Sequence, residues 1–157
     1  MYSTIQTLKN KIDLRQLLQY VNDEKRLDVE IDFENAPDTD ICVQRVNQAA
    51  VEVQEEIDTY LRGRYKLPLA TIPYTITMIS DDRVIYNLKK RRFRNDITES
   101  EQKIFDQSTK QLQLIQRGEM ILDIEKVSST EATTDGQIYT NKTASDKIFT
   151  KDLMTRF

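Results

Sequence analysis

A run of apolar residues spaced three and four apart is the strongest periodic pattern in this chain. Its members are Val46, Ala49, Ala50, Val53, Ile57, Tyr60 and Leu61. This spacing places them on one face of an α-helix. We expect the helix to begin after Asp38 or Asp40, either of which can cap it, and to end near Arg62. At about 1.5 Å per residue, such a helix would be roughly 35 Å long.

Two short helices are expected before this long one. Ser3 can cap the first, over residues 3–9. Asp13 can cap the second, whose apolar stripe is formed by Leu14, Leu17 and Leu18.

The stretch from residue 27 to residue 33 alternates apolar and acidic residues, which predicts a half-buried strand. Asp28, Glu30 and Asp32 would share its polar face. These carboxylates could ligate a cation, but a solvated strand face is favoured, because calcium sites need six or more oxygen ligands. A second short strand is expected over residues 119–124.

A second long helix is expected to begin at Pro73, whose missing N–H costs nothing in a first helical turn, and to run to about Arg94. Thr71 is an alternative cap. The apolar residues of this helix include Ile76, Ile79, Val84, Tyr86 and Leu88.

A third long helix is expected to start at Thr98, which forms a capping box with Glu101, and to end at Gly118. Its inner face is expected to contain Ile104, Phe105, Leu112 and Ile115.

The link between the first two long helices, residues 64–73, contains two of the three prolines and directly follows Gly63, one of the three glycines. Gly63 is expected to have a positive φ or to close the preceding helix as its cap. Pro68 disfavours a helical conformation at Leu67, so residues 66–70 should be extended. Tyr65 could anchor an interface, although a tyrosine after a helix more often fills the core.

The C-terminal part of the chain changes character. Residues 127–147 are rich in Ser, Thr and Asp and contain too few apolar residues to fold alone. Apolar residues then return in a docking tail, residues 148–157, with Ile148, Phe149, Leu153, Met154, Arg156 and Phe157 as candidate contacts. We therefore expect a helical domain over residues 1–124 and an extended C-terminal arm over residues 125–157.

The predicted fold class is mainly α: a bundle of three long helices with short N-terminal helices, a small β element and the extended arm. Histidine is absent and Cys42 is the single cysteine, which excludes His-based zinc sites and Ser-His-Asp or Cys-His catalysis. The three glycines are isolated, so no phosphate-binding loop is present. We expect no metal, no cofactor and no enzyme, although carboxylate or lysine chemistry stays open.

The formal net charge of -3 gives no general indication of nucleic-acid binding. No apolar run approaches the roughly 20 residues of a membrane span, and the N-terminus does not resemble a secretion signal. A cytoplasmic setting is therefore expected.

One basic run stands out, with five positive charges at Lys89, Lys90, Arg91, Arg92 and Arg94. It could contact DNA phosphates, it could bind an acidic patch on a partner, or it could be a solvated helix end favoured by the helix dipole. Asp81 and Asp82 precede it and point about 100° apart on a helix, which makes them a poor catalytic pair. One of them is expected to pair with Arg83 or with a lysine of a neighbouring helix.

The stretch before and within the link resembles a known signature. A helix ends Ile-Asp-x-Tyr-Leu, Gly-Arg-Tyr-x-Leu-Pro-Leu follows, and a proline opens the next helix. The matching positions are Ile57, Asp58, Tyr60, Leu61, Gly63, Arg64, Tyr65, Leu67, Pro68, Leu69 and Pro73. This pattern is similar to that of the Mu-like head-to-tail connector proteins of tailed phages, also called adaptors or head-completion proteins. The opening MYSTIQTL and the ending KIFTKDLMTRF also resemble that family.

The resemblance implies a structural protein without catalytic residues. It implies a ring, usually of twelve copies, under the portal protein, which extends the DNA channel and joins a tail or stopper protein. The implied place is the neck of the virion, assembled in the bacterial cytoplasm, without contact to membranes. In such a ring, the basic residues Lys89, Lys90, Arg91, Arg92 and Arg94 are candidate contacts to the portal protein or to channel DNA. The alternative from the residues alone is a small helical DNA-binding protein that uses the basic run.

Overall fold

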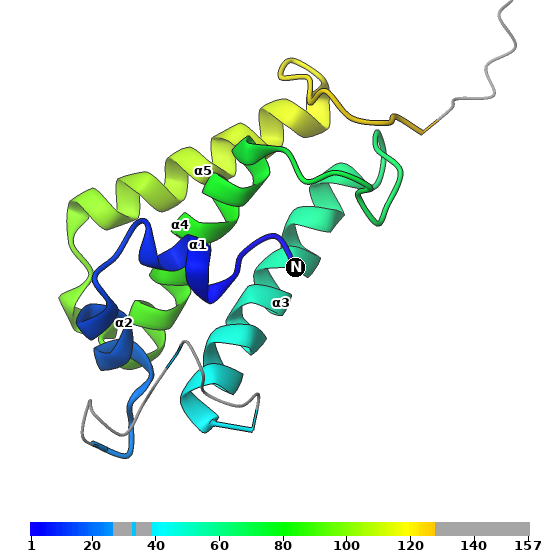
Figure 1. Ribbon diagram of the computed structural model, residues 1–157. Coiled ribbons are helices and arrows are strands. Elements are labelled where there is room, and N and C mark those ends of the chain that lie inside the picture. The colour runs from blue at the N-terminus through cyan, green and yellow to red at the C-terminus, as the bar shows by residue number, and fades with distance from the viewer. Residues whose placement is uncertain (27–32, 34–38, 128–157) are drawn as a thin grey trace, which may run out of the picture. The chain divides into compact units, whose positions relative to one another are not determined.

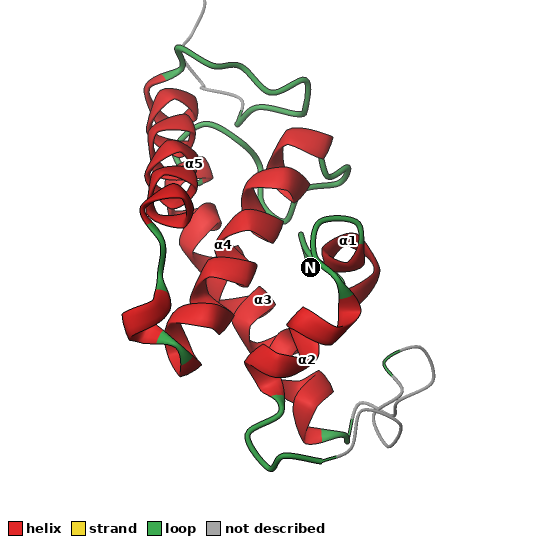
Figure 2. Cartoon of the chain, turned by 90° about the vertical axis from the view of Figure 1, so that its left-hand side faces the viewer, coloured by secondary structure: helices red, strands yellow, loops and turns green. Residues whose placement is uncertain are grey.

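The computed structural model describes residues 1–26, 33 and 39–127. The described residues form α1 (Ile5–Lys9), α2 (Leu14–Val21), α3 (Ile41–Leu61), α4 (Tyr74–Arg92), the 3-10 turn η2 (Arg94–Asp96) and α5 (Glu99–Arg117). They contain no β-strand, and their β pairing is a single antiparallel bridge between Tyr65 and Lys126 (Figure 2). The predicted mainly helical fold is therefore confirmed.

The three long helices form the centre of the compact unit Met1–Val127. α3, α4 and α5 contact one another in all three pairings, and α1 and α2 pack against α4 (Figure 1). Bonds from Lys89 to Glu101 and from Arg83 to Ser108 show that α4 and α5 are antiparallel. The predicted bundle of three long helices is thus observed.

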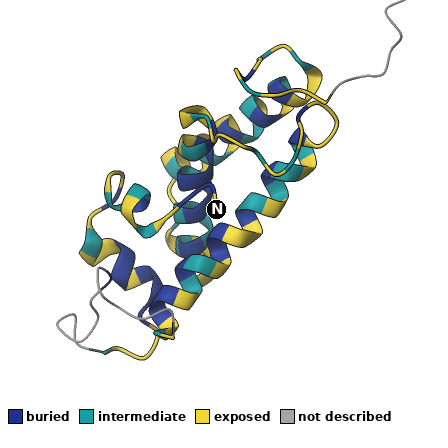
Figure 3. Ribbon diagram, turned by 45° about the vertical axis from the view of Figure 1, so that its right-hand side comes forward, coloured by how far each residue is buried: buried dark blue, intermediate teal, exposed yellow. Residues whose placement is uncertain are grey.

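The core follows the periodicity of α3. Six of its seven pattern residues are buried, and the seventh, Tyr60, packs partly against the core. Buried positions lie on the helix faces that point toward one another (Figure 3). Leu112 and Ile115 of α5 are also buried as expected, but Ile104 is 48% exposed, so its prediction as an inner residue is wrong.

Most helix starts agree with the sequence. Asp13 caps α2, Asp40 caps α3, and the capping box of Thr98 and Glu101 opens α5. Pro73 is the N-cap of α4, which displaces the alternative at Thr71.

The prediction of Ser3 as the first cap is wrong, because Thr4 caps α1 and forms a capping box with Thr7. Ser3 is instead buried, and its hydroxyl donates a hydrogen bond of 2.6 Å to Ser80 Oγ. The hydroxyl is therefore engaged with α4 rather than with the first turn of α1.

The prediction that Gly63 has a positive φ or caps α3 is also wrong. α3 ends at Leu61 with Arg62 as a right-handed C-cap, and the described glycine with positive φ is Gly118, at +82°. Arg64 N and Tyr65 N both donate to Leu61 O at 2.9 Å, so a tight turn closes the helix without a left-handed residue.

The link is not extended throughout residues 66–70. The chain bends at Leu67 and Pro68, and the peptide bond between them is cis. The expectation considered only the preference of the residue before a trans proline, and the observed bend corrects it.

Residues 119–124 do not form the predicted strand. Glu119 N and Met120 N both donate to Leu114 O, and this turn continues from the left-handed Gly118. Leu122 is buried, whereas Ile121 is 64% exposed. The predicted strand over residues 27–33 lies outside the described residues except for Phe33, which is buried.

Candidate functional site

Residues 64–66 of the link form hydrogen bonds with residues 122–127, and we call this arrangement the clamp. Tyr65 is 1% exposed, and its hydroxyl accepts a hydrogen bond of 2.9 Å from Leu122 N. Lys66 N donates to Glu125 O at 3.3 Å, and Val127 N donates to Arg64 O at 2.9 Å. Residues 125–127, which were assigned to the arm from sequence, are therefore bonded to the helical unit, and Tyr65 is a buried tether.

Arg64 binds the end of α5. Its Nη1 donates a hydrogen bond of 3.1 Å to Arg117 O, next to the left-handed Gly118. A guanidinium at this position neutralises part of the negative end of the helix dipole.

The remaining signature residues are also structural. Ile57 and Leu61 are buried, while Tyr60, Leu67 and Leu69 pack against the core. Asp58 accepts a short hydrogen bond from the Tyr2 hydroxyl, which attaches the N-terminus to α3. Burial and the neighbouring Asp58 carboxylate raise the pKa of Tyr2 well above its ordinary value.

The basic run mostly makes contacts within the molecule. Lys89 forms an ion pair with Glu101 at 2.6 Å, and Arg91 forms a two-pronged pair with Asp23 at 2.6 and 3.0 Å. Arg92 lies 3.7 Å from the Asp23 carboxylate. Lys90 and Arg94 are exposed, with the Lys90 ammonium 5.7 Å from the centre of the Tyr86 ring. Contact of the run with DNA or with a partner stays a prediction.

Three arginines bind the C-terminus of α2. Arg92 donates to the carbonyls of Gln19 and Asn22 at 2.5 and 2.6 Å, Arg91 to Tyr20 O at 2.8 Å, and Arg45 to Val21 O at 2.6 Å. The last carbonyls of an α-helix have no partner within the helix, so side-chain donors are favourable there. Arg45, Arg91 and Arg92 are the arginine cluster.

Two carboxylates complete the arginine cluster. The hydrogen bond from Arg91 lowers the pKa of Asp23 below its ordinary value, and the hydrogen bond from Arg45 lowers the pKa of Glu24 to about 2. Both groups are therefore ionised near neutral pH and balance the positive charge.

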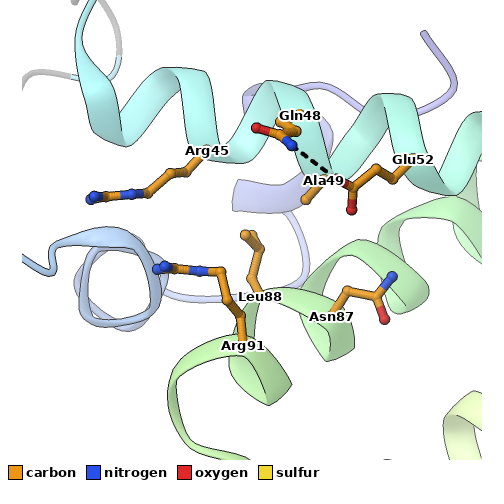
Figure 4. Close-up of a pocket in the computed structure, with 7 residues that line it drawn as sticks. All are labelled: Arg45, Gln48, Ala49, Glu52, Asn87, Leu88 and Arg91. Atoms are coloured by element: carbon orange, nitrogen blue, oxygen red, sulfur yellow. Dashed lines mark hydrogen bonds between the residues drawn. The ribbon is translucent and has the colours of Figure 1, made fainter.

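Figure 4 shows Arg45 of α3 and Arg91 of α4 at one end of a hollow between these two helices. At the other end, Gln48 donates a hydrogen bond of 3.0 Å to Glu52. Both arginines already bind the end of α2 and the acidic residues that follow it. Neither arginine is therefore available to bind an anionic ligand in this hollow.

The sequence predicted Arg83 only as a partner of Asp81 or Asp82 and gave no indication that it is buried in α4, where it is 1% exposed. Its guanidinium pairs with Glu56 of α3, donates 2.9 Å hydrogen bonds to Ser108 and Thr109 of α5, and lies 4.3 Å from the centre of the Phe105 ring. The available signal was its position four residues after Ile79, on the buried face of α4. Arg83 joins all three long helices.

The adjacent carboxylates separate as expected. Asp82 pairs at 2.6 Å with a lysine, as predicted, but this residue, Lys11, lies in the turn between α1 and α2 rather than in a helix. Asp81 is buried and accepts a hydrogen bond of 2.8 Å from the Thr7 hydroxyl. Burial raises the pKa of Asp81 above its ordinary value.

A groove between α4 and α5 was also overlooked. Two adjoining hollows share Lys11, Asp82 and Ile104 and together run from Thr75 to Tyr86 on α4. Met78 and Ile104 are 41% and 48% exposed beside it. We call this the α4–α5 groove, and it places apolar surface next to polar side chains from both helices.

Among the described residues, no group of three or more side chains is placed to hold a metal ion. No helix in the described part of the chain is long and apolar enough to cross a membrane. The predicted docking tail, Ile148 to Phe157, lies outside the described residues.

A protein-family model described as Bacteriophage Mu, Gp36 matches residues 2–140. The match includes the whole link and the residues that the clamp holds, and it ends before the docking tail. No curated protein matches the chain.

Proposed function

Because the chain belongs to the Bacteriophage Mu Gp36 family, we propose that it is a structural protein that connects the head and tail of a tailed phage. In this proposal, twelve copies form a ring beneath the portal protein, extend the DNA channel and bind the tail or a stopper protein. The protein acts through surfaces rather than through catalysis.

The observation that carries the proposal is the family match over residues 2–140, which spans both halves of the clamp. The clamp joins residues 64–66 to residues 125–127 within that range. The remainder of the C-terminal arm therefore starts from a held point on the helical unit. An arm whose first residues are already fixed loses less conformational entropy when it binds a defined partner.

Different parts of the chain are suited to different roles. Most signature residues build the helical unit: Ile57, Leu61 and Tyr65 are buried in it, and Tyr60, Leu67 and Leu69 pack against its core. Surfaces for partners are then left to the α4–α5 groove, to exposed Lys90 and Arg94, and to the docking tail. In the proposed particle, Phe149 and Phe157 of that tail are buried anchors, because interface energy concentrates in a few aromatic and arginine residues.

The test is to inactivate the gene in the phage that encodes this chain and to examine the particles by electron microscopy. We expect heads that contain portal protein but carry no tails, and purified chain added back should occupy the site under the portal. Normal tailed particles without the chain would contradict the proposal.

A second measurement separates the DNA-binding alternative. Retardation of duplex DNA with a steep dependence on salt would indicate phosphate contacts. We expect little retardation, because Lys89, Arg91 and Arg92 are engaged within the molecule.

A further inference from the structure

We propose that the α4–α5 groove binds the docking tail of a second copy of this chain. This inference deepens the proposed function, because it names the contact between neighbouring copies. Its first basis is the exposed apolar surface at the groove, where Met78 of α4 and Ile104 of α5 are both more than 40% exposed.

The shape of the groove suits a short helix. Its lining residues on α4 extend from Thr75 to Tyr86, about 16 Å along the helix axis, with Gln107 and Gln111 of α5 opposite. A helix laid in an apolar groove is a common mode of peptide recognition.

The pattern of the docking tail is complementary. Phe149, Leu153 and Phe157 are spaced four apart, which is typical of one face of an amphipathic helix. Nine residues in a helix would span about 12 Å, within the length of the groove. Lys151 would lie on the opposite face, whereas Arg156, three residues after Leu153, would lie at the edge of the apolar face.

Charge is balanced in the groove. The carboxylates of Asp82 and Glu101 line it, but Asp82 pairs with Lys11 and Glu101 pairs with Lys89, each at 2.6 Å. The contact with the tail is therefore expected to depend on apolar surface rather than on charge.

The length of the arm makes a second copy accessible. Residues 128–147 could span up to about 65 Å when extended. A groove and a tail are different surfaces, so their contact between copies is heterologous, and a heterologous contact closes into a ring when its rotation permits. Each copy would then offer one groove and receive one tail.

The test is chemical cross-linking of the full-length chain without phage heads. Chains with Gln107→Cys are mixed with chains with Thr155→Cys, and a short bismaleimide is added. The native Cys42 is buried, and burial raises the pKa of its thiol, so it should not react. We expect a cross-linked dimer that contains one chain of each kind. Glu55→Cys, on the exposed part of α3, replaces Gln107→Cys as the matched control and should give at least about tenfold less product.

Surface variants identify the groove as the binding site. Met78→Asp with Ile104→Asp should reduce the cross-linked product by about tenfold, whereas Val51→Asp on the exposed part of α3 should not. Circular dichroism confirms that each variant is folded, and if the double variant is unfolded, Ile104→Asp alone replaces it. No cross-link between the two kinds of chain, or product equal to that of the Glu55→Cys control, would overturn the proposal. A positive result stands even if the protein does not join phage heads.

Discussion

The guanidinium of Arg64 lies where a side chain on Gly118 would be. An ideal Cβ at Gly118 would come within 2.2 Å of Arg64 Nη2, while Nη1 donates to the neighbouring Arg117 carbonyl. Gly118 therefore provides both a left-handed C-cap for α5 and the space that the Arg64 side chain occupies.

Gly118→Ala should destabilise the protein by about 1–2 kcal/mol, because it places a side chain in the left-handed region and displaces Arg64. Gly63→Ala is the matched control. No atom lies within 4 Å of its added Cβ, and its φ is not positive, so we expect no loss of stability. Urea unfolding of both variants measures the difference, and equal midpoints would refute this account of Gly118.

Arg83→Ala should cost about 3 kcal/mol, because it removes a buried guanidinium that serves Glu56, Ser108 and Thr109. Arg83→Lys should recover part of this loss, since an ammonium cannot form the two-pronged pair. Arg94→Ala, at an exposed position, should change the free energy of unfolding by less than about 0.5 kcal/mol. Thermal and urea unfolding check the order, and a loss for Arg94→Ala as large as that for Arg83→Ala would contradict it.

Within the basic run, Arg92→Ala should destabilise the protein by about 1 kcal/mol, because two carbonyls at the end of α2 lose their donor. Lys90→Ala should be neutral within about 0.5 kcal/mol. Neutralising Lys90 and Arg94, which do not bind α2, tests whether the basic run contacts a partner. If it does, the loss of assembly should be greater at low salt than at high salt. Unchanged assembly at both salt concentrations would favour a solvated helix end.

Lowering the pH should weaken the ion pairs that the arginine cluster forms with Asp23 and Glu24 at the C-terminus of α2. The pKa values of Asp23 and Glu24 are below their ordinary values of 3.8 and 4.5 in the folded protein, so the unfolded chain binds more protons as the pH falls. Their contribution is fully present above about pH 5 and is lost as the pH falls toward the folded pKa values, near 2 for Glu24.

Urea unfolding at pH 7, 5 and 3 checks this expectation. Asp23→Asn with Glu24→Gln should be less stable than the wild type at pH 7 and should lose less stability between pH 5 and pH 3. Glu55→Gln on exposed α3 serves as the control, and an unchanged pH slope in the double variant would refute the role of these carboxylates.

Deletion of residues 146–157 should leave the helical signal and the melting temperature nearly intact, because the compact unit ends at Val127. The same deletion should abolish attachment to heads that contain the portal protein. Circular dichroism and sedimentation of the chain with heads measure the two effects. Normal attachment, or loss of the helical core, would contradict the proposed role of the docking tail.

Local sequence patterns determined much of the helical architecture. The apolar spacing of α3, the caps at Asp13 and Asp40, the box at Thr98 and the stop at Gly118 all act within one or two helical turns. Such signals are readable from sequence because the interacting groups are neighbours in the chain. The family signature was also readable, although its residues gave no indication that they form a clamp.

Tertiary structure decided which polar residues were available for function. Arg83 and the arginine cluster look like surface charges in sequence, but their partners lie on other helices, 25 or more residues away for Arg83. Residues 119–124 were misjudged for a related reason, because Leu122 N donates to the hydroxyl of Tyr65, 57 residues earlier in the chain. Contacts between distant residues carry no local pattern, so the fold alone determines which donors are satisfied and which surfaces, such as the α4–α5 groove, stay exposed.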